Sequence, residues 1–447
     1  MKEKGVILPI FSLPSKYGIG DFGNEAYEFI NILSENNIQY WEILPINACN
    51  KLPYSPISYY ALNEEYISLD KLKEKGLIEN PQDRESSENA KYDNYKEKYY
   101  IEAFSNFKID EDFIEFGNLK EINQYAEYMS NSNGKDKNYY LFLQYILYEQ
   151  WMNLKEYANS KNVKIIGDMP IYPAFDSVET LYNMKYFQND NGIFEFEAGT
   201  PPDFYSKTGQ KWNTPVYNIQ KLEEDNYWYL TKRYNMYLKL FDIVRIDHFR
   251  GYDSFYKIPI DEPGTNGYYE DGLSYNFFNE LLKNPSIKPQ HFIVEDLGDI
   301  REETVKLRDY YGFTGQKILQ TSIDLYNMKD NYTSNNNIMV MPGNHDTHTI
   351  KSWYNNLNGY DKAKLQEFLK INNCEDENIN WSIIKYCFKS NSKIIMVTIQ
   401  DILELDDSAR VNVPGTENYS NWLWKLQDFE DLKKKIYYYG RIEYEEQ

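Results

Sequence analysis

The chain has 447 residues, of which 48 are Lys or Arg and 69 are Asp or Glu, so its net charge at neutral pH is −21. This acidic balance argues against a nucleic-acid-binding surface, because phosphate backbones are bound by Lys and Arg. The three cysteines form no C-x-x-C pair, no apolar run reaches the roughly 18 residues of a membrane span, and no signal peptide precedes the first apolar run, so we expect a cytoplasmic protein without membrane association.

Short apolar runs that end in polar, Gly or Pro residues are typical of buried parallel strands. Eight such runs occur, at residues 5–11, 40–45, 163–171, 242–249, 292–297, 317–323, 337–341 and 394–402. Helical or irregular segments separate them, and residues 24–33 have the apolar spacing of an amphipathic helix. Eight strands alternating with helices predict an α/β fold, the (β/α)8 TIM barrel.

The spacing of these runs is uneven. Residues 46–162 lie between the second and third predicted strands and are rich in Lys, Glu, Asn and Tyr, and within them residues 141–154 have helical apolar spacing. We therefore expect a mostly helical insertion at about residues 62–160. With no clear linker on either side, residues 1–447 are predicted to form a single catalytic domain.

Four of the predicted strands lead into side chains that carry acid–base chemistry. These are Asp168 after the third strand, Arg245, Asp247 and His248 after the fourth, Glu295 and Asp296 after the fifth, and His345, Asp346 and His348 after the seventh. In a TIM barrel the catalytic groups lie at the C-terminal ends of the strands, so these side chains should meet at one rim. A single Asp in such a place often caps the next helix, but four sites in register indicate a catalytic centre.

Carboxyl groups on neighbouring strands suit glycoside chemistry. A retaining mechanism needs a nucleophilic carboxylate and a carboxylic acid about 5–5.5 Å apart. Arg245 and Asp247 share one strand face, so Arg245 can keep Asp247 ionised as the nucleophile. Glu295, on the next strand, is the best placed acid, and Asp346 could bind sugar hydroxyls and stabilise the transition state.

Longer motifs identify a family. The set RIDHFRG, EDLG and HDT resembles the α-amylase clan, and further blocks narrow the resemblance to the 4-α-glucanotransferase (amylomaltase, or disproportionating enzyme) family. Those blocks are residues 13–23 (LPSKYGIGDFG), 53–58 (PYSPIS), 167–172 (GDMPIY), 199–217 (GTPPDFYSKTGQKWNTPVY), 400–405 (QDILEL) and 409–426 (ARVNVPGTENYSNWLWKL). They occur in order over nearly the whole chain. The family has no C-terminal β-sandwich, and the chain leaves no room for one.

The resemblance implies a role for each matching residue. Asp247 would be the nucleophile, Glu295 the general acid/base and Asp346 the third carboxylate. The implied substrate-binding or supporting residues are Arg245, which would orient Asp247; His345 and Tyr54, at the donor glucose; Asp168, which would support the site; Trp212, Asp203 and Gln210, on the acceptor loop; and Asn412. The chain departs from the family pattern at Thr347 and His348 after His-Asp, at residues 268–274, at Asn213 and at Phe175, which we expect to affect specificity more than activity.

The sequence therefore predicts a transferase that moves an α-1,4-glucan segment to the 4-hydroxyl of a glucose or maltooligosaccharide, needs no cofactor or metal, and is a monomer or weak homo-oligomer. Three alternatives remain: an amylase-like hydrolase with the same site, a metal hydrolase that uses His345 and His348, and a glucan-binding protein without turnover. Products from maltotriose would distinguish transfer, hydrolysis and binding.

Overall fold

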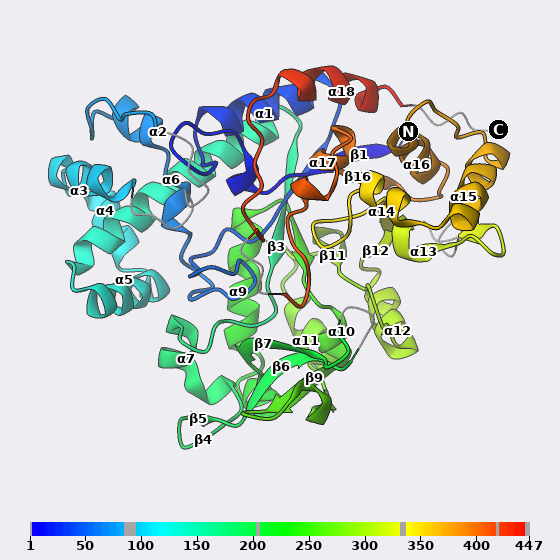
Figure 1. The fold of residues 1–447 in the computed structure, drawn as a ribbon. Coiled ribbons are helices and arrows are strands. Elements are labelled where there is room, and N and C mark those ends of the chain that lie inside the picture. Colours follow the sequence, from blue (N-terminus) through cyan, green and yellow to red (C-terminus); the bar gives the residue numbers. More distant parts are fainter. Residues whose placement is uncertain (1, 85–94, 203–205, 331–336, 417–419, 443–447) are drawn as a thin grey trace.

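Eight parallel strands form the centre of the computed structural model, which describes residues 2–84, 95–202, 206–330, 337–416 and 420–442 (Figure 1). The strands are β1 (Glu3–Ile7), β2 (Tyr40–Ile43), β3 (Lys164–Met169), β8 (Ile243–Ile246), β11 (Phe292–Val294), β12 (Gly315–Ile318), β15 (Ile338–Met341) and β16 (Ile394–Thr398). Their order is β11-β8-β3-β2-β1-β16-β15-β12, and the parallel bridge between Ile293 and Thr314 joins the two edges. The predicted (β/α)8 TIM barrel is confirmed.

Each of the eight predicted runs overlaps a barrel strand, and three of the runs have the largest boundary errors. The first strand ends at Ile7, and Ile10–Ser12 form a 3-10 helix instead of extending it. The sixth strand is Gly315–Ile318, two residues earlier than predicted, and the helix α13 (Leu319–Ser322) takes up most of the remaining run. The eighth run continues after β16 as the helix α17 (Ile399–Ile402). In the first and last runs, buried residues past the strand end gave the same apolar signal as the strand.

The barrel interior has an apolar floor. One residue from each of seven strands, and two from β15, pack together there; they are Ile7, Tyr40, Ile166, Ile243, Ile293, Ile318, Met339, Met341 and Met396. Side chains alternate along a strand, so the next inward-facing position after Ile166 is Asp168 and the next after Ile243 is Arg245. The polar site is thus built on a packed apolar layer.

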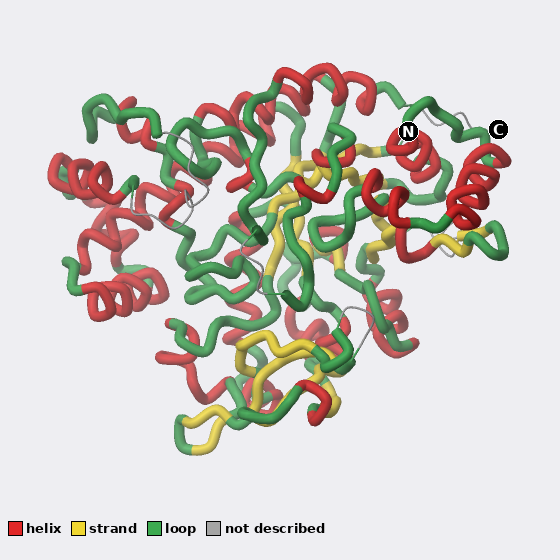
Figure 2. Tube along the Cα trace, in the orientation of Figure 1, coloured by secondary structure: helices red, strands yellow, loops and turns green. Residues whose placement is uncertain are grey.

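Helices surround the barrel (Figure 2). Outside the insertion, and in addition to α13 and α17, they are α1 (Asn24–Glu35), α7 (Val178–Asn183), α8 (Ile219–Glu224), α9 (Trp228–Leu240), α10 (Arg250–Asp253), α11 (Ser274–Leu281), α12 (Glu302–Tyr311), α14 (Ile350–Asn356), α15 (Gly359–Ile371), α16 (Ile379–Cys387) and α18 (Glu430–Gly440). The predicted amphipathic segment 24–33 lies in α1, whose buried face includes Phe29, Ile30 and Leu33.

Between β2 and β3 the described chain carries five helices, which lie on one side of the barrel, opposite α14, α15 and α16 (Figure 1). They are α2 (Leu69–Glu74), α3 (Glu97–Asn106), α4 (Glu111–Gly117), α5 (Lys120–Asn133) and α6 (Lys137–Ser160). The helix α6 packs against α3, α4 and α5 and also against α1 and β3. It therefore joins this region to the barrel wall.

A second sheet, which the sequence did not predict, lies at the bottom of the view in Figure 1. Its antiparallel strands have the order β10-β9-β6-β7 and are β6 (Phe196–Thr200), β7 (Gln210–Pro215), β9 (Ser254–Pro259) and β10 (Tyr268–Asp271). Two short hairpins form separate two-stranded sheets. One pairs β4 (Asn189–Asp190) with β5 (Ile193–Phe194), and the other pairs β13 (Ile323–Asp324) with β14 (Lys329–Asp330). The insertions are therefore not all helical.

Gly167 places Asp168 by letting β3 pack closely against its neighbours. A Cβ at this position would lie 2.2 Å from the ring of Phe241, which is closer than any side-chain carbon can approach. Gly167 therefore allows Phe241 to pack on the outer face of β3, while Asp168 faces the barrel interior.

Candidate active site

The predicted acidic residues meet at the C-terminal ends of the barrel strands. Asp168 lies in β3 and is paired in register with Arg245 in β8. Asp247 follows β8, Glu295 follows β11, and Asp346 lies in the loop after β15. Hydrogen bonds and ion pairs join these residues into one cluster, described below.

Arg245 is the centre of this cluster. Its Nη1 donates to both carboxylate oxygens of Asp168, at 2.7 Å each, and to Oδ1 of Asp247 at 3.2 Å. Its Nη2 lies 3.3 Å from Oε2 of Glu295, and its Nε donates to Gln316 at 3.3 Å. The guanidinium is 1% exposed. The predicted pairing of Arg245 with Asp247 is therefore present, but the shortest contacts of Arg245 are with Asp168.

Backbone hydrogen bonds fix the two carboxyl groups that follow β8 and β11. The N–H of His248 donates to Oε2 of Glu295 at 2.7 Å, and the N–H of Phe249 donates to the carbonyl of Glu295 at 3.1 Å. The N–H of Asp247 donates to the carbonyl of Met169 at 3.2 Å. His248 has a φ of 46°, a left-handed conformation that turns the chain sharply after the strand.

The Asp247 and Glu295 carboxyls influence each other's protonation. Burial, together with the negative charges of Glu295 and Asp168, raises the pKa of Asp247 well above its usual range. Burial acts in the same direction on Glu295, but the Arg245 guanidinium and the His248 N–H outweigh it and lower the pKa of Glu295. The two carboxyls titrate as a coupled pair. In the free enzyme these shifts make Asp247 the more readily protonated member, which is the opposite of the expectation from the sequence that Arg245 keeps Asp247 ionised.

Asp346 is held by groups from two loops. The side-chain amide of Asn412 donates to its Oδ1 at 2.6 Å, and Nε2 of His345 lies 3.4 Å from its Oδ2. The Asp346 N–H donates to Asn344 at 3.0 Å. Arg410, which the sequence reasoning missed, donates to the Asp346 carbonyl. The predicted residue Asn412 thus acts on Asp346 in this structure.

Tyr54 connects Asp168 with His345. Its hydroxyl donates to Oδ2 of Asp168 at 2.6 Å and lies 2.9 Å from Nε2 of His345. The Tyr54 and His345 rings are stacked, with centroids 5.6 Å apart and planes at 14°. Trp422 packs against Tyr54 and His345, at 5.8 and 6.3 Å. Trp422 was not singled out from the sequence, although it belongs to the family-like block 409–426.

Trp212, Gln210 and Asp203 were predicted on the acceptor loop. Trp212 lies in β7, and its ring meets that of His248 edge-on at 4.8 Å, next to Asp247 and Glu295. The Trp212 Nε1–H donates to Gln210 at 3.4 Å. Asp203 lies outside the described residues. The second sheet thus brings Trp212 to His248, which follows Asp247 in the chain.

Thr347 and His348, where the chain departs from the family pattern, stabilise the loop around Asp346. The Thr347 hydroxyl accepts from the N–H of Asn344 at 3.0 Å, and Nδ1 of His348 is paired with Asp407. His345 and His348 therefore have different partners. Among the described residues, no group of three or more His, Cys, Asp or Glu is arranged to hold a metal ion.

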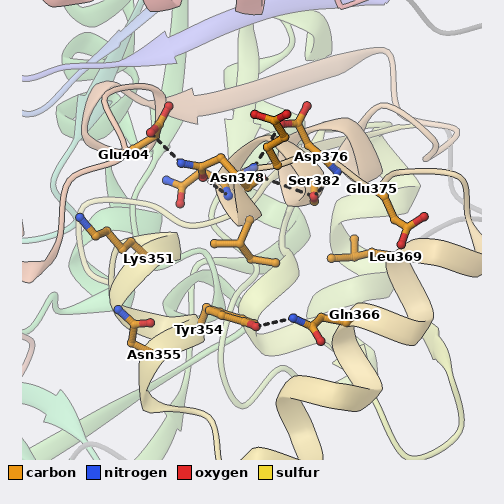
Figure 3. A pocket seen from close by; sticks show the side chains of 13 residues that line it. Lys351, Tyr354, Asn355, Gln366, Leu369, Glu375, Asp376, Asn378, Ser382 and Glu404 are labelled. Atoms are coloured by element: carbon orange, nitrogen blue, oxygen red, sulfur yellow. Dashed lines mark hydrogen bonds between the residues drawn. The ribbon is translucent and has the colours of Figure 1, made fainter.

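A cavity of about 540 Å³ lies outside this cluster, between α14, α15 and α16 (Figure 3). Tyr354 and Gln366 lie side by side at one edge of it and are joined by a 2.8 Å hydrogen bond. Its lining, within the described chain, contains none of the predicted site residues. The site is therefore identified by the chemistry of the strand ends rather than by this cavity.

The sequence matches the family described as 4-alpha-glucanotransferase over residues 8–138 and 124–431. It is 32% identical to a 4-alpha-glucanotransferase of Aquifex aeolicus, over 99% of this chain and 100% of that protein. It is 35% identical to the one of Clostridium butyricum, over 97% and 100%. The structure resembles the amylomaltase of Streptococcus agalactiae solved in complex with acarbose, with a TM-score of 0.90, 28% identity and 99% coverage of both chains.

Among the described residues no helix combines the length and the apolar character needed to cross a membrane. The barrel, the joined carboxyl groups and the full-length relatives agree on one family. The chain therefore belongs to glycoside hydrolase family 77, the amylomaltases, and has the 4-alpha-glucanotransferase activity of that family.

Proposed function

We propose that the enzyme transfers α-1,4-glucan segments by a retaining double displacement, with Asp247 as nucleophile and Glu295 as general acid/base. The observation that carries this assignment is that one buried guanidinium, that of Arg245, contacts both carboxyls. This keeps the two groups close, as a retaining mechanism needs, since the carboxyls of an inverting enzyme are about 6.5–9.5 Å apart.

In the first step Glu295 gives its proton to the glycosidic oxygen while Asp247 attacks the anomeric carbon. The C–O bond of the donor breaks, the reducing-end part leaves as a free sugar, and the remaining glucosyl chain becomes an ester of Asp247. In the second step Glu295 takes the proton from the 4-hydroxyl of an acceptor, whose oxygen replaces Asp247. Two inversions give net retention.

The surrounding residues have distinct proposed roles. Asp346, held by Asn412 and 3.4 Å from His345, binds donor hydroxyls and stabilises the positive charge that develops on the sugar ring. Tyr54 offers its ring to the donor glucose, and Asp168 fixes both Tyr54 and Arg245. The Streptococcus agalactiae relative was solved with acarbose, which supports α-glucan oligosaccharides as ligands here.

On the acceptor side we propose that Trp212 and Gln210, with Asp203, bind the incoming sugar. Trp212 packs on His248 beside the two carboxyls, so a sugar bound against it would keep water from the glucosyl ester. This exclusion is what favours transfer over hydrolysis.

We further propose that residues 1–447 act as one catalytic domain, as a monomer or weak homo-oligomer, in the cytoplasm and without a cofactor or metal. The three cysteines, all of them among the described residues, form no disulfide, which supports a reducing compartment. Fractionation of cells with an antibody, and light scattering of the purified protein, test these points.

The test of the catalytic proposal is the product pattern from maltotriose. Transfer gives glucose together with oligosaccharides longer than maltotriose, whereas hydrolysis gives only shorter sugars. The Asp247→Asn and Glu295→Gln variants should each lose turnover while keeping the wild-type melting temperature within a few degrees. Retained transfer in either folded variant would reject the role given to that residue.

A further inference from the structure

Glu42 is a carboxyl group inside the barrel that the steps above do not use. It lies on β2, where Tyr40 faces the apolar interior while Trp41 and Ile43 face the outer core. Strand alternation therefore points Glu42 into the barrel. Glu42 is 1% exposed, and its Oε2 has no hydrogen-bond partner among the described residues. A buried carboxyl oxygen without a partner is costly, so its presence requires an explanation.

The strand register places Glu42 directly below the catalytic cluster. Glu42 is paired with Ile7 of β1 and with Ile166 of β3, both of which belong to the apolar floor. The next inward-facing residue of β3 is Asp168, which is paired with Arg245 of β8. Glu42 thus lies level with these floor residues, one inward-facing layer below Asp168 and Arg245.

The charges that act on Glu42 come from the three strands that follow β2 in the sheet, namely β3, β8 and β11. They are Arg245 from β8, Asp168 from β3 and Glu295 from the end of β11. The carboxyls that pair with Arg245 among the described residues are those of Asp168, Asp247 and Glu295. Burial therefore raises the pKa of Glu42 to about 7; Arg245 opposes this shift, and the negative charges of Asp168 and Glu295 add to it.

We propose that Glu42 is a positioning residue of the active site, whose gain or loss of charge sets how tightly Glu295 holds its proton; this proposal rests on the acid/base role proposed for Glu295. A carboxylate at Glu42 places a negative charge beneath Arg245 and Glu295. That charge disfavours ionisation of the coupled Asp247–Glu295 pair, so the pair keeps the proton that Glu295 delivers as the acid to a higher pH. A neutral Glu42 removes this effect.

The kinetic test is the pH dependence of kcat/KM in Glu42→Gln, with glucose release from maltotriose as the assay. Gln has nearly the shape of a protonated Glu and cannot ionise. We expect the alkaline limb of the variant to lie at lower pH than that of the wild type, by up to about one pH unit, the low end of the effect of a neighbouring like charge. A purely structural role would lower the rate at every pH without moving the limb.

A matched control is Glu64→Gln. Glu64 belongs to the 3-10 helix η2 (Glu64–Tyr66), and burial also raises its pKa to about 7. The groups that act on it are Tyr125, Glu65 and Lys135, which are outside the catalytic cluster. Glu64→Gln should therefore leave the alkaline limb where it is in the wild type.

A second measurement does not depend on catalysis. A carboxyl whose pKa is higher in the folded than in the unfolded state binds a proton on folding. Its ionisation therefore lowers the free energy of unfolding as the pH rises from the pKa of the unfolded state, about 4.3, toward the pKa of the folded state, about 7. Both Gln variants remove this cost. The melting temperature of each, relative to the wild type, should therefore increase between pH 5 and pH 8.

The two measurements together decide the proposal. It holds if the alkaline limb moves in Glu42→Gln but not in Glu64→Gln, and if the relative melting temperature of Glu42→Gln rises with pH. It fails if the alkaline limb of Glu42→Gln coincides with that of the wild type within the error of the fit, or if the relative melting temperature of Glu42→Gln does not change with pH. Failure of the Glu295 assignment is seen separately, as transfer activity retained by Glu295→Gln.

Discussion

Replacement of Arg245 by Lys tests the centre of the cluster. Lys keeps one positive charge, but its single compact ammonium cannot reproduce the planar fork that contacts three carboxyls. The two shortest contacts are with Asp168, so we expect Lys to stay there and to lose Asp247 and Glu295. Each hydrogen bond to a charged group contributes about 1.5–3 kcal/mol. A tenfold change in kcat/KM corresponds to about 1.4 kcal/mol of activation free energy, so the loss of the contacts with Asp247 and Glu295 predicts a fall in kcat/KM of about 10²–10⁴.

The assay is glucose release from maltotriose, with the melting temperature recorded in parallel. Arg308→Lys is the matched control, because Arg308 is also buried and paired with a buried carboxylate, Asp296, but does not contact the catalytic carboxyls. The control should lose stability and less than tenfold in kcat/KM. The reasoning would be refuted if the Arg245→Lys variant remained folded and kept its kcat/KM within fivefold of the wild-type value.

Three further changes have expected results. Asn412→Ala removes the 2.6 Å donor to Asp346 and should lower kcat/KM about 10- to 100-fold, the loss of one hydrogen bond to a charged group, measured by glucose release. Tyr54→Phe keeps the ring but loses the 2.6 Å hydrogen bond to Asp168. We expect kcat/KM to fall about tenfold and the melting temperature to fall by a few degrees, and an unchanged rate would contradict the role of the hydroxyl. Burial lowers the pKa of His248 to about 4, so His248 is neutral between pH 5 and 8. The His248→Gln variant should therefore leave both limbs of the pH–rate profile in place. A limb displaced within that range would show that His248 titrates there.

The meeting of the acidic side chains at one rim could be predicted from the sequence, because their positions follow from a simple rule. Parallel strands in a barrel end at the same rim, so Asp168, Asp247 and Glu295 had to approach one another once their strands were recognised. The identity of the shortest partner of Arg245 could not be predicted in this way. It depends on the register between β3 and β8, which pairs Arg245 with Asp168 and is fixed only by the packed barrel.

The missed features share a physical cause. The strands β7 (QKWNTP) and β10 (YYED) lack an apolar run, because they belong to a sheet that is only partly buried, so the strand pattern was absent. Glu42 lay inside a correctly predicted strand but was overlooked, because its neighbours Trp41 and Ile43 gave the strand signal. The buried surroundings of Glu42 arise from strands that are distant in the sequence, namely β3 and β8.

The central claim is that the glucosyl group is held on Asp247 during transfer. The Glu295→Gln variant, given an α-maltosyl fluoride donor and no acceptor, can form the ester because fluoride leaves without acid catalysis, but it lacks the base that would hasten the second step. Proteolysis and mass spectrometry of the quenched enzyme should then find one maltosyl group on the peptide that contains Asp247. A maltosyl group on another residue, or an unmodified enzyme that still releases fluoride, would contradict the account.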